Sequence, residues 1–213
     1  MLTVDRLSYG YNTPLLKEVS FSLARGEIVS LLGVSGAGKS TLFRLITKLL
    51  KPHGGVITLG GEVTYMMQED HLLPWRSVLE NIRLPLELSK KKGDGEIHSL
   101  IHEMGLEGKE DLYPHQLSMG MRQRVSLARA LSLKRPILLL DEPFASLDMK
   151  RKEEFYKLLK KRDDLTILLI THDFHDALAL SNRMLVLKEG VIQGEFKDLH
   201  CIPDLKSQVH LML

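Results

Sequence analysis

Short apolar runs and helical repeats alternate along most of the chain. The run from Ile28 to Leu32 stands directly before a glycine-rich stretch, and apolar residues then recur at helical spacing. These residues are Leu42, Leu45, Ile46, Leu49 and Leu50. The order predicts a strand, a loop and an amphipathic helix. The runs in PILLLDEP and LTILLITHD do not alternate with polar residues, as is typical of strands buried on both faces of a parallel sheet. Because helical patterns lie between these strands, the core is predicted to be α/β.

Two regions depart from this pattern. From Asp70 to Lys134 the patterns are mainly helical, with polar breaks at SKKKGDGE and DLYPHQ, which predicts an inserted helical subdomain. The opening segments LTVDRLSY and VSFSL alternate, and GGVITLGGEVTYMM resumes the alternation, which predicts a small antiparallel sheet beside the core. We therefore expect one domain over 1–213, in which 1–69 and 135–213 form the core with its antiparallel part and 70–134 form the helical subdomain.

Composition and charge indicate an ordinary globular protein but do not indicate which molecule it binds. The chain has 213 residues, of which 44% are hydrophobic and 26% charged, as in an ordinary globular protein. The net charge of +2 does not indicate a surface that coats nucleic acid. The single cysteine excludes an internal disulfide framework. No apolar run approaches the roughly 18 residues that span a bilayer, so we expect a soluble chain that reaches a membrane only through another subunit.

The glycine-rich stretch after the first buried strand is a candidate phosphate-binding loop. GVSGAGKS matches the pattern G-x-x-x-x-G-K-[ST] and has the required strand before it and helix after it. In such a loop the backbone amides turn toward the β-phosphate, Lys39 reaches the β- and γ-phosphates, and Ser40 offers a hydroxyl to magnesium. The predicted nucleotide-binding residues here are Gly33, Ser35, Gly36, Gly38, Lys39, Ser40 and Thr41. The alternative is a glycine-rich turn with a chance lysine, and the flanking elements argue against it.

The stretch ILLLDEP supplies a second candidate part of the same site. Asp141, at the end of a buried strand, can hold magnesium through water, and the adjacent Glu142 can accept a proton from an attacking water. Two acidic residues that merely begin a loop are the alternative. Their position after an apolar strand and downstream of a phosphate loop favours hydrolysis of a bound nucleotide.

A third candidate lies in LSMGMRQRVSLARA, where Ser118 is placed to cap a helix and Gly120 leaves backbone amides uncovered. A helix start of this kind favours negative charge, yet no phosphate motif is adjacent in the sequence. A well-capped helix without a ligand is the alternative.

Taken together, these motifs resemble those of the nucleotide-binding subunits of ATP-binding cassette (ABC) transporters, over nearly the whole chain. Further matches are Gln68 in YMMQEDHLLPW for the Q-loop, Ser118 to Met121 for the signature, Asp148 in SLD for the D-loop and His172 in ITHD for the switch histidine. The order of the motifs makes the resemblance specific. It implies a P-loop NTPase (RecA-like) core with a parallel sheet, a small antiparallel β subdomain and an inserted helical subdomain.

The resemblance also implies roles for these residues, with ATP and Mg²⁺ as cofactors. Gln68 contacts magnesium and water, His172 hydrogen-bonds the γ-phosphate, and Asp148 contacts the opposite cassette. Two cassettes pair head to tail, so that Ser118 and Gly120 of one protomer meet the γ-phosphate held by the other.

Several positions stay open. Tyr11 is the preferred residue for stacking on adenine, with Tyr9 as a rival and a surface tyrosine as the alternative. Met119 replaces the glycine that usually follows the signature serine, which costs little if its φ is negative and more if φ is positive.

The segment Leu72, Leu73, Pro74 and Trp75 could form a partly exposed apolar patch, which in the family receives a coupling helix of the permease. Alternatively, Trp75 packs in the core of the helical subdomain. For His98 and His102, a solvated helix face is favoured over a metal site. For SKKKGDG, a charged surface loop is favoured over contact with anionic headgroups or the permease.

The sequence thus predicts an ATP-hydrolysing subunit that powers an ABC membrane transporter, most similar to bacterial importers for nitrate, sulfonates, taurine or pyrimidine precursors. The expected partners are a second copy on ATP binding, integral membrane permease subunits and an extracytoplasmic solute-binding protein, with no nucleic acid. The expected location is cytoplasmic, peripheral on the inner face of the plasma membrane. The alternatives are the ATPase of an ABC exporter or lipoprotein-releasing complex, a soluble non-transport ABC ATPase, and a P-loop kinase.

Overall fold

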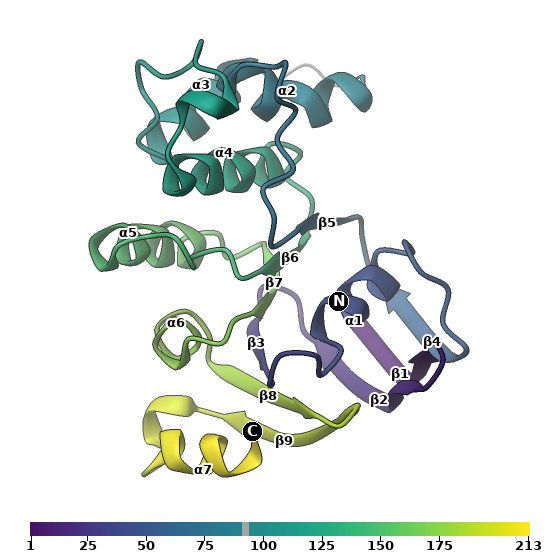
Figure 1. The fold of residues 1–213 in the computed structure, drawn as a ribbon. Coiled ribbons are helices and arrows are strands. Elements are labelled where there is room, and N and C mark those ends of the chain that lie inside the picture. The colour runs from purple at the N-terminus through teal and green to yellow at the C-terminus, as the bar shows by residue number, and fades with distance from the viewer. Residues whose placement is uncertain (91–93) are drawn as a thin grey trace.

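The computed structural model describes residues 1–90 and 94–213, which form two sheets and their covering helices (Figure 1). A six-stranded sheet has the strand order β5-β6-β7-β3-β8-β9, and a three-stranded sheet has the order β2-β1-β4. The larger, central sheet consists of β3 (Ile28–Leu32), β5 (Val63–Met66), β6 (Ile137–Asp141), β7 (Thr166–Ile170), β8 (Arg183–Lys188) and β9 (Val191–Lys197). The smaller sheet consists of β1 (Leu2–Gly10), β2 (Pro14–Leu23) and β4 (Gly54–Leu59).

The central sheet is parallel except at one edge. Strands β5, β6, β7, β3 and β8 pair in parallel, and β9 returns antiparallel to β8. The turn between β8 and β9 contains Glu189 and Gly190, both with positive φ (50° and 84°), as the twist of a tight hairpin requires. The predicted α/β class is confirmed.

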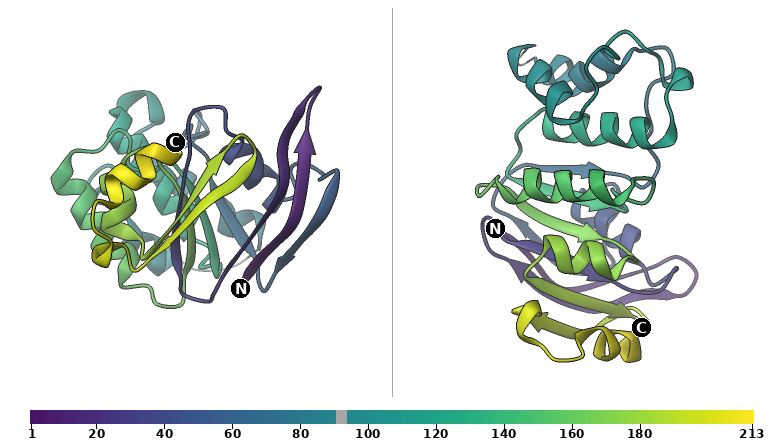
Figure 2. Two further views of the ribbon diagram at one scale, coloured as in Figure 1. Left: turned by 90° about the horizontal axis from the view of Figure 1, so that it is seen from below. Right: turned by 90° about the vertical axis from the view of Figure 1, so that its left-hand side faces the viewer.

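Both faces of the central sheet are covered, which explains its unbroken apolar runs. In β6, Ile137 and Leu139 pack with the antiparallel sheet and α1 (Lys39–Ile46), whereas Leu138 and Leu140 pack with helices on the opposite face. Figure 2 shows the antiparallel sheet on one side of the central sheet and the helices α5 (Met149–Lys160) and α6 (Phe174–Leu180) on the other. The last helix, α7 (Leu205–Met212), follows the short η2 (Leu199–Cys201) and packs on β8 and β9.

A group of helices lies between β5 and β6 in the chain and at the β5 edge of the central sheet in space (Figure 1). It consists of α2 (Val78–Leu88), α3 (Asp94–Glu103), η1 (Pro114–Gln116) and α4 (Met119–Leu131). Its apolar residues join one cluster with Leu138 and Leu140 of β6, so the helices are packed onto the core. The predicted charged loop SKKKGDG includes 91–93, which lie outside the described residues. Within 1–90 and 94–213 there is no helix of the length and hydropathy that crossing a membrane requires.

Two details of the sequence-based prediction are wrong. The segment VTYM does not continue the antiparallel sheet but forms β5, which pairs in parallel with β6 and forms the edge of the central sheet. The turn at Gly60 and Gly61 separates it from β4, and alternation alone cannot tell which sheet a strand joins. The helix after the phosphate loop ends at Ile46 rather than Leu50, because Lys48 has a φ of 60°, which no helix interior adopts.

Candidate functional site

One cavity of about 560 Å³ brings most of the predicted site residues together. It lies where β3, β6 and β7 end, and in an open α/β sheet ligands bind beyond the carboxyl ends of the strands. The predicted residues that line it are Tyr11, Gly33, Ser35, Gly36, Gly38, Lys39, Ser40, Thr41, Gln68, Asp141, Glu142 and His172. Leu15 and Ile170 complete the lining, and the sequence analysis did not identify either of them.

The phosphate loop needs its glycines for two different reasons. A Cβ at Gly33 would lie 2.4 Å from the carbonyl oxygen of Leu187, so the close approach of β8 leaves no room for a side chain. Gly38 has a φ of 101° and directly precedes α1, a conformation that other residues rarely adopt. The chain can therefore turn sharply from β3 into α1, whose first amides have no partner within the helix.

Lys39 is the first residue of α1 and folds back over the loop. Its Nζ donates hydrogen bonds to the carbonyl oxygens of Gly33 (2.7 Å) and Val34 (2.9 Å). Burial lowers the pKa of Lys39, while the charges of Glu142 and Asp141 act in the opposite direction. A cation is thus held above the loop, at the place where a phosphate chain would lie.

Two carboxylates face this lysine from the end of β6. Asp141 is only 2% exposed, and its Oδ2 accepts a hydrogen bond of 3.1 Å from the hydroxyl of Tyr65. Burial and the charge of Asp141 raise the pKa of Tyr65, so the tyrosine stays a donor.

Glu142 has an unusual backbone and a buried carboxylate. Its φ is 51°, its N–H donates to the carbonyl oxygen of Ile170 (2.9 Å), and its carbonyl oxygen accepts from Nε2 of Gln123 (3.1 Å). Oε1 of Glu142 lies 2.9 Å from Nδ1 of His172. Burial raises the pKa of Glu142, and the contact with His172 opposes this rise. A base with a raised pKa beside an open cavity is suited to accept a proton from water.

The donor set of the cavity fits Mg²⁺. The hydroxyl of Ser40, the carboxylate of Asp141 and the amide of Gln68 all line the cavity, and these are the oxygen ligands that a hard cation prefers. In the part of the chain that the structure describes, no group of three or more His, Cys, Asp and Glu side chains could hold a metal. Magnesium commonly takes one or two carboxylates and completes its shell with phosphates and water, so this arrangement is sufficient.

Three predicted site residues lie outside this cavity. Ser118 caps α4 by accepting from the N–H of Met121 (3.3 Å), and Asp148 caps α5 by accepting from the N–H of Arg151 (3.0 Å). A Cβ at Gly120 would lie 3.1 Å from the carbonyl oxygen of Ser146, so the glycine lets α4 approach the loop that carries Asp148. The structure thus places these residues together, but outside the cavity at the phosphate loop of the same chain.

The structure also bears on the positions that the sequence left open. Met119 is the first residue of α4 and has helical backbone, so its side chain imposes no left-handed conformation. Tyr11 lines the cavity, whereas Tyr9 packs behind it with an edge-to-face ring distance of 5.2 Å. Trp75 is 70% exposed, which contradicts its packing in a core, although Leu72 of the same segment is buried. His98 and His102 lie on the exposed face of α3.

Two further polar side chains contact the site residues, and sequence reasoning missed both. Tyr65 holds Asp141, and Gln123 joins the carbonyl oxygen of Glu142 to the hydroxyl of Ser146 (3.3 Å). Of the two, only Tyr65 could have been suspected from the sequence, because it stands in the same short segment as the candidate Gln68. Both contacts depend on tertiary structure: that of Tyr65 on the pairing of β5 with β6, and that of Gln123 on the packing of α4 against the end of β6.

Comparison with known proteins decides the family. The family profile described as ABC transporter matches residues 16–145. The chain belongs to the ABC transporter family. It is 42% identical to the formylaminopyrimidine import ATP-binding protein ThiZ of Halalkalibacterium halodurans, with 98% of this chain and 88% of the relative covered. It is 40% identical to the aliphatic sulfonates import ATP-binding protein SsuB 1 of Rhodococcus jostii, with 99% and 89% covered.

A solved structure agrees with this membership. The bacterial ABC transporter cassette MJ0796, solved as a dimer, superposes with a TM-score of 0.86 at 30% identity over 92% of this chain and 98% of that one. The same cassette, solved as a dimer in a post-hydrolysis state bound to ADP and Pi, gives the same TM-score and identity. The predicted resemblance to the family and the predicted P-loop NTPase fold are confirmed.

Proposed function

We propose that this chain binds and hydrolyses ATP and thereby powers an ABC importer for a small solute. The observation that carries the proposal is the cavity in which Lys39, Asp141 and the Glu142–His172 pair meet around the phosphate loop. A P-loop kinase would need a phosphate acceptor site here, whereas the raised pKa of Glu142 suits activation of water. The names of the relatives, which are import ATP-binding proteins, support transport as the purpose of hydrolysis.

The chemistry follows from the positions of the side chains. The loop amides and Lys39 bind the β- and γ-phosphates, for which Lys39 exchanges its bonds to Gly33 and Val34 for phosphate oxygens. Ser40, Asp141 and Gln68 would hold Mg²⁺, which would neutralise charge on the phosphates. Glu142 accepts a proton from the attacking water, and His172 orients Glu142 and contacts the γ-phosphate. Tyr11 stacks on the adenine.

The site is completed by a second copy of the chain. Ser118, Gly120 and Asp148 lie outside their own cavity, and the first amides of α4 have no partner within the helix. In a head-to-tail dimer these groups face the γ-phosphate held by the other protomer. The dimeric structures of a 30% identical cassette support this arrangement.

The helical segment 70–134 acts as one subdomain that moves toward the core when nucleotide binds. Asp70, just after Gln68, is tied to α4, because its carboxylate accepts from Nε of Arg122 (3.0 Å) and its carbonyl oxygen accepts from Arg129 (2.5 Å). Gln68 is exposed between this tied segment and β5. The division into 1–69 with 135–213 and 70–134 therefore places the hinge at the Q-loop.

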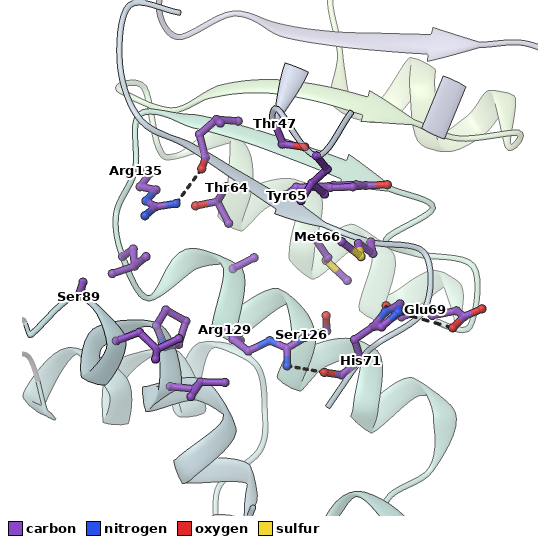
Figure 3. A pocket seen from close by; sticks show the side chains of 18 residues that line it. Thr47, Thr64, Tyr65, Met66, Glu69, His71, Ser89, Ser126, Arg129 and Arg135 are labelled. Atoms are coloured by element: carbon purple, nitrogen blue, oxygen red, sulfur yellow. Dashed lines mark hydrogen bonds and ion pairs between the residues drawn. The ribbon is translucent and has the colours of Figure 1, made fainter. Parts of the chain in front are cut away.

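The membrane partner docks in a second cavity, of about 690 Å³, between β5 and the helices α2 and α4 (Figure 3). Apolar side chains of α2, among them Leu84, Pro85 and Leu88, form one wall of it. Such a groove fits an apolar helix of a permease subunit, and the exposed Trp75 lies on the same subdomain. The chain then works at the cytoplasmic face of the membrane, with an extracytoplasmic solute-binding protein in the full complex.

Two variants test the hydrolytic role. Lys39→Ala removes the phosphate ligand and should abolish binding of a fluorescent ATP analogue, whereas Lys51→Ala, an exposed lysine outside the cavity, should bind normally. Glu142→Gln should bind the analogue but lower phosphate release by roughly 100-fold or more, because a general base supplies about 10²–10⁴ in rate. Undiminished binding by Lys39→Ala would remove the basis of the proposal.

A further inference from the structure

One side chain connects the groove, lined by Leu84, Pro85 and Leu88 on one side, to the cavity at the phosphate loop. Tyr65 lies on β5, in the wall of the docking groove beside Thr47 and Thr64 (Figure 3). Its hydroxyl points inward from this edge strand and donates to Oδ2 of Asp141 on β6, which lines the nucleotide cavity. Tyr65 thus belongs to the groove wall, while its hydroxyl is bonded to a carboxylate of the proposed catalytic site.

The position of Tyr65 follows from the strand register. β5 and β6 pair in parallel with Tyr65 opposite Leu139, and Asp141 lies two residues further along β6. Side chains alternate between faces along a strand, so Tyr65, Leu139 and Asp141 lie on the same face of the sheet. Phe43 of α1 meets the tyrosine ring edge-to-face at 5.5 Å, which restricts the ring and aims the hydroxyl along the sheet.

We infer that Tyr65 is a positioning residue that holds Asp141 in the orientation needed to bind Mg²⁺, from within the wall of the docking groove. This inference rests on the proposed function. Asp141 is almost fully buried, and its bond to the hydroxyl fixes the torsion of the carboxylate. Partners behind a metal ligand commonly change metal affinity by about 10–100-fold when they are removed.

The test separates magnesium binding from folding and from turnover. Tyr65→Phe keeps the ring and removes only the hydroxyl. Calorimetric titration with ADP in EDTA should give the wild-type affinity, since the phosphate loop is unchanged. In titrations of ADP against increasing Mg²⁺, the half-saturating Mg²⁺ concentration should rise roughly tenfold. Electron paramagnetic resonance of Mn²⁺ with ADP gives the same comparison with a visible metal.

Two controls come from the same chain. Thr64→Val alters the neighbouring groove residue, whose hydroxyl makes no hydrogen bond within the described residues, and should leave the Mg²⁺ dependence unchanged. Tyr113→Phe removes a hydroxyl from a partly exposed tyrosine outside both cavities and should also have no effect.

The outcomes distinguish this inference from the proposed function. If wild-type protein binds ADP and Tyr65→Phe shows the same Mg²⁺ dependence, the positioning role is overturned and the ATPase proposal stands. If the variant loses affinity for ADP in EDTA as well, the hydroxyl serves the fold rather than the metal site, and the inference is equally overturned. If the wild type binds no adenine nucleotide at all, the proposed function fails first.

Discussion

At the residue scale, Glu142 shows how the fold prepares a side chain for chemistry. A φ of 51° is uncommon for a residue other than glycine, and such a conformation costs roughly 1–3 kcal/mol. Hydrogen bonds to Ile170 and from Gln123 hold this backbone from two different elements. The carboxylate is thereby turned away from β6 and toward His172, with 11% of its side chain exposed.

The raised pKa of Glu142 makes stability depend on pH. Burial disfavours the ionised form in the folded chain, so wild-type protein loses stability as pH rises from below the ordinary glutamate pKa through the raised folded pKa. Glu142→Gln has no such loss. We expect the variant to be more stable than wild type in urea unfolding at pH 8 and the difference to narrow toward pH 5. Glu153→Gln, on the exposed face of α5, should show no pH-dependent difference, and a Glu142→Gln gap independent of pH would contradict the burial argument.

At the element scale, α2 and α4 both begin with a serine N-cap, but their first turns differ. Ser77 caps α2 by accepting from the N–H of Glu80, and Ser118 caps α4 by accepting from the N–H of Met121, both at 3.3 Å. The carboxylate of Glu80 accepts a hydrogen bond from the N–H of Ser77, which completes a capping box in α2. The first turn of α4 has no acidic residue, so no carboxylate of that turn competes with an external anion for the amides other than that of Met121.

Alanine substitutions of the two capping serines separate helix stability from catalysis. Ser77→Ala and Ser118→Ala should each cost about 1 kcal/mol and lower the melting temperature by roughly 2–4 °C. Only Ser118→Ala should also reduce ATP hydrolysis, by roughly tenfold or more, because the proposed dimer would lose a donor to the phosphate held by the other protomer. Thermal unfolding and phosphate release on both variants provide the comparison. Equal loss of hydrolysis in both would show that helix stability alone is responsible.

At the scale of the whole molecule, the proposed dimer would assemble its catalytic site from two separate surfaces of the chain. One half is the nucleotide cavity at the ends of β3, β6 and β7, and the other is formed by the starts of α4 and α5. Within one copy the second surface does not line the cavity, so the proposed site needs a second copy. Bound ATP supplies the negative charge that both halves attract, so we expect dimerisation to depend on nucleotide.

Blocking hydrolysis should trap the closed pair. With ATP, Glu142→Gln should elute with the mass of a dimer in size-exclusion chromatography with light scattering, and without nucleotide it should elute as a monomer. The Lys39→Ala, Glu142→Gln double variant should stay monomeric with ATP, because it lacks the phosphate ligand. A Glu142→Gln protein that remains monomeric with ATP while releasing phosphate at the wild-type rate would rule out the shared site.

Much of the fold and of the nucleotide cavity could be predicted from the sequence, because their determinants are local. The phosphate loop, the apolar strand before Asp141 and the serine cap of α4 each lie within one short segment, and backbone geometry at that segment specifies them. Local sequence patterns did not predict which strand a segment pairs with or where a helix ends. Alternation in VTYM indicated a strand without naming its neighbour, and a helical repeat up to Leu50 did not reveal the left-handed Lys48.

The sequence by itself determined the residue types and the order of the motifs, and through them the family and the chemistry around a bound triphosphate. Only the tertiary structure decided that Tyr65 bonds Asp141, that Gln123 holds Glu142, and that Trp75 faces solvent. The physical reason is that these contacts join segments 19 to 76 residues apart, or depend on what the rest of the chain leaves uncovered. Such distances are settled by strand pairing and helix packing, which short-range propensity does not encode.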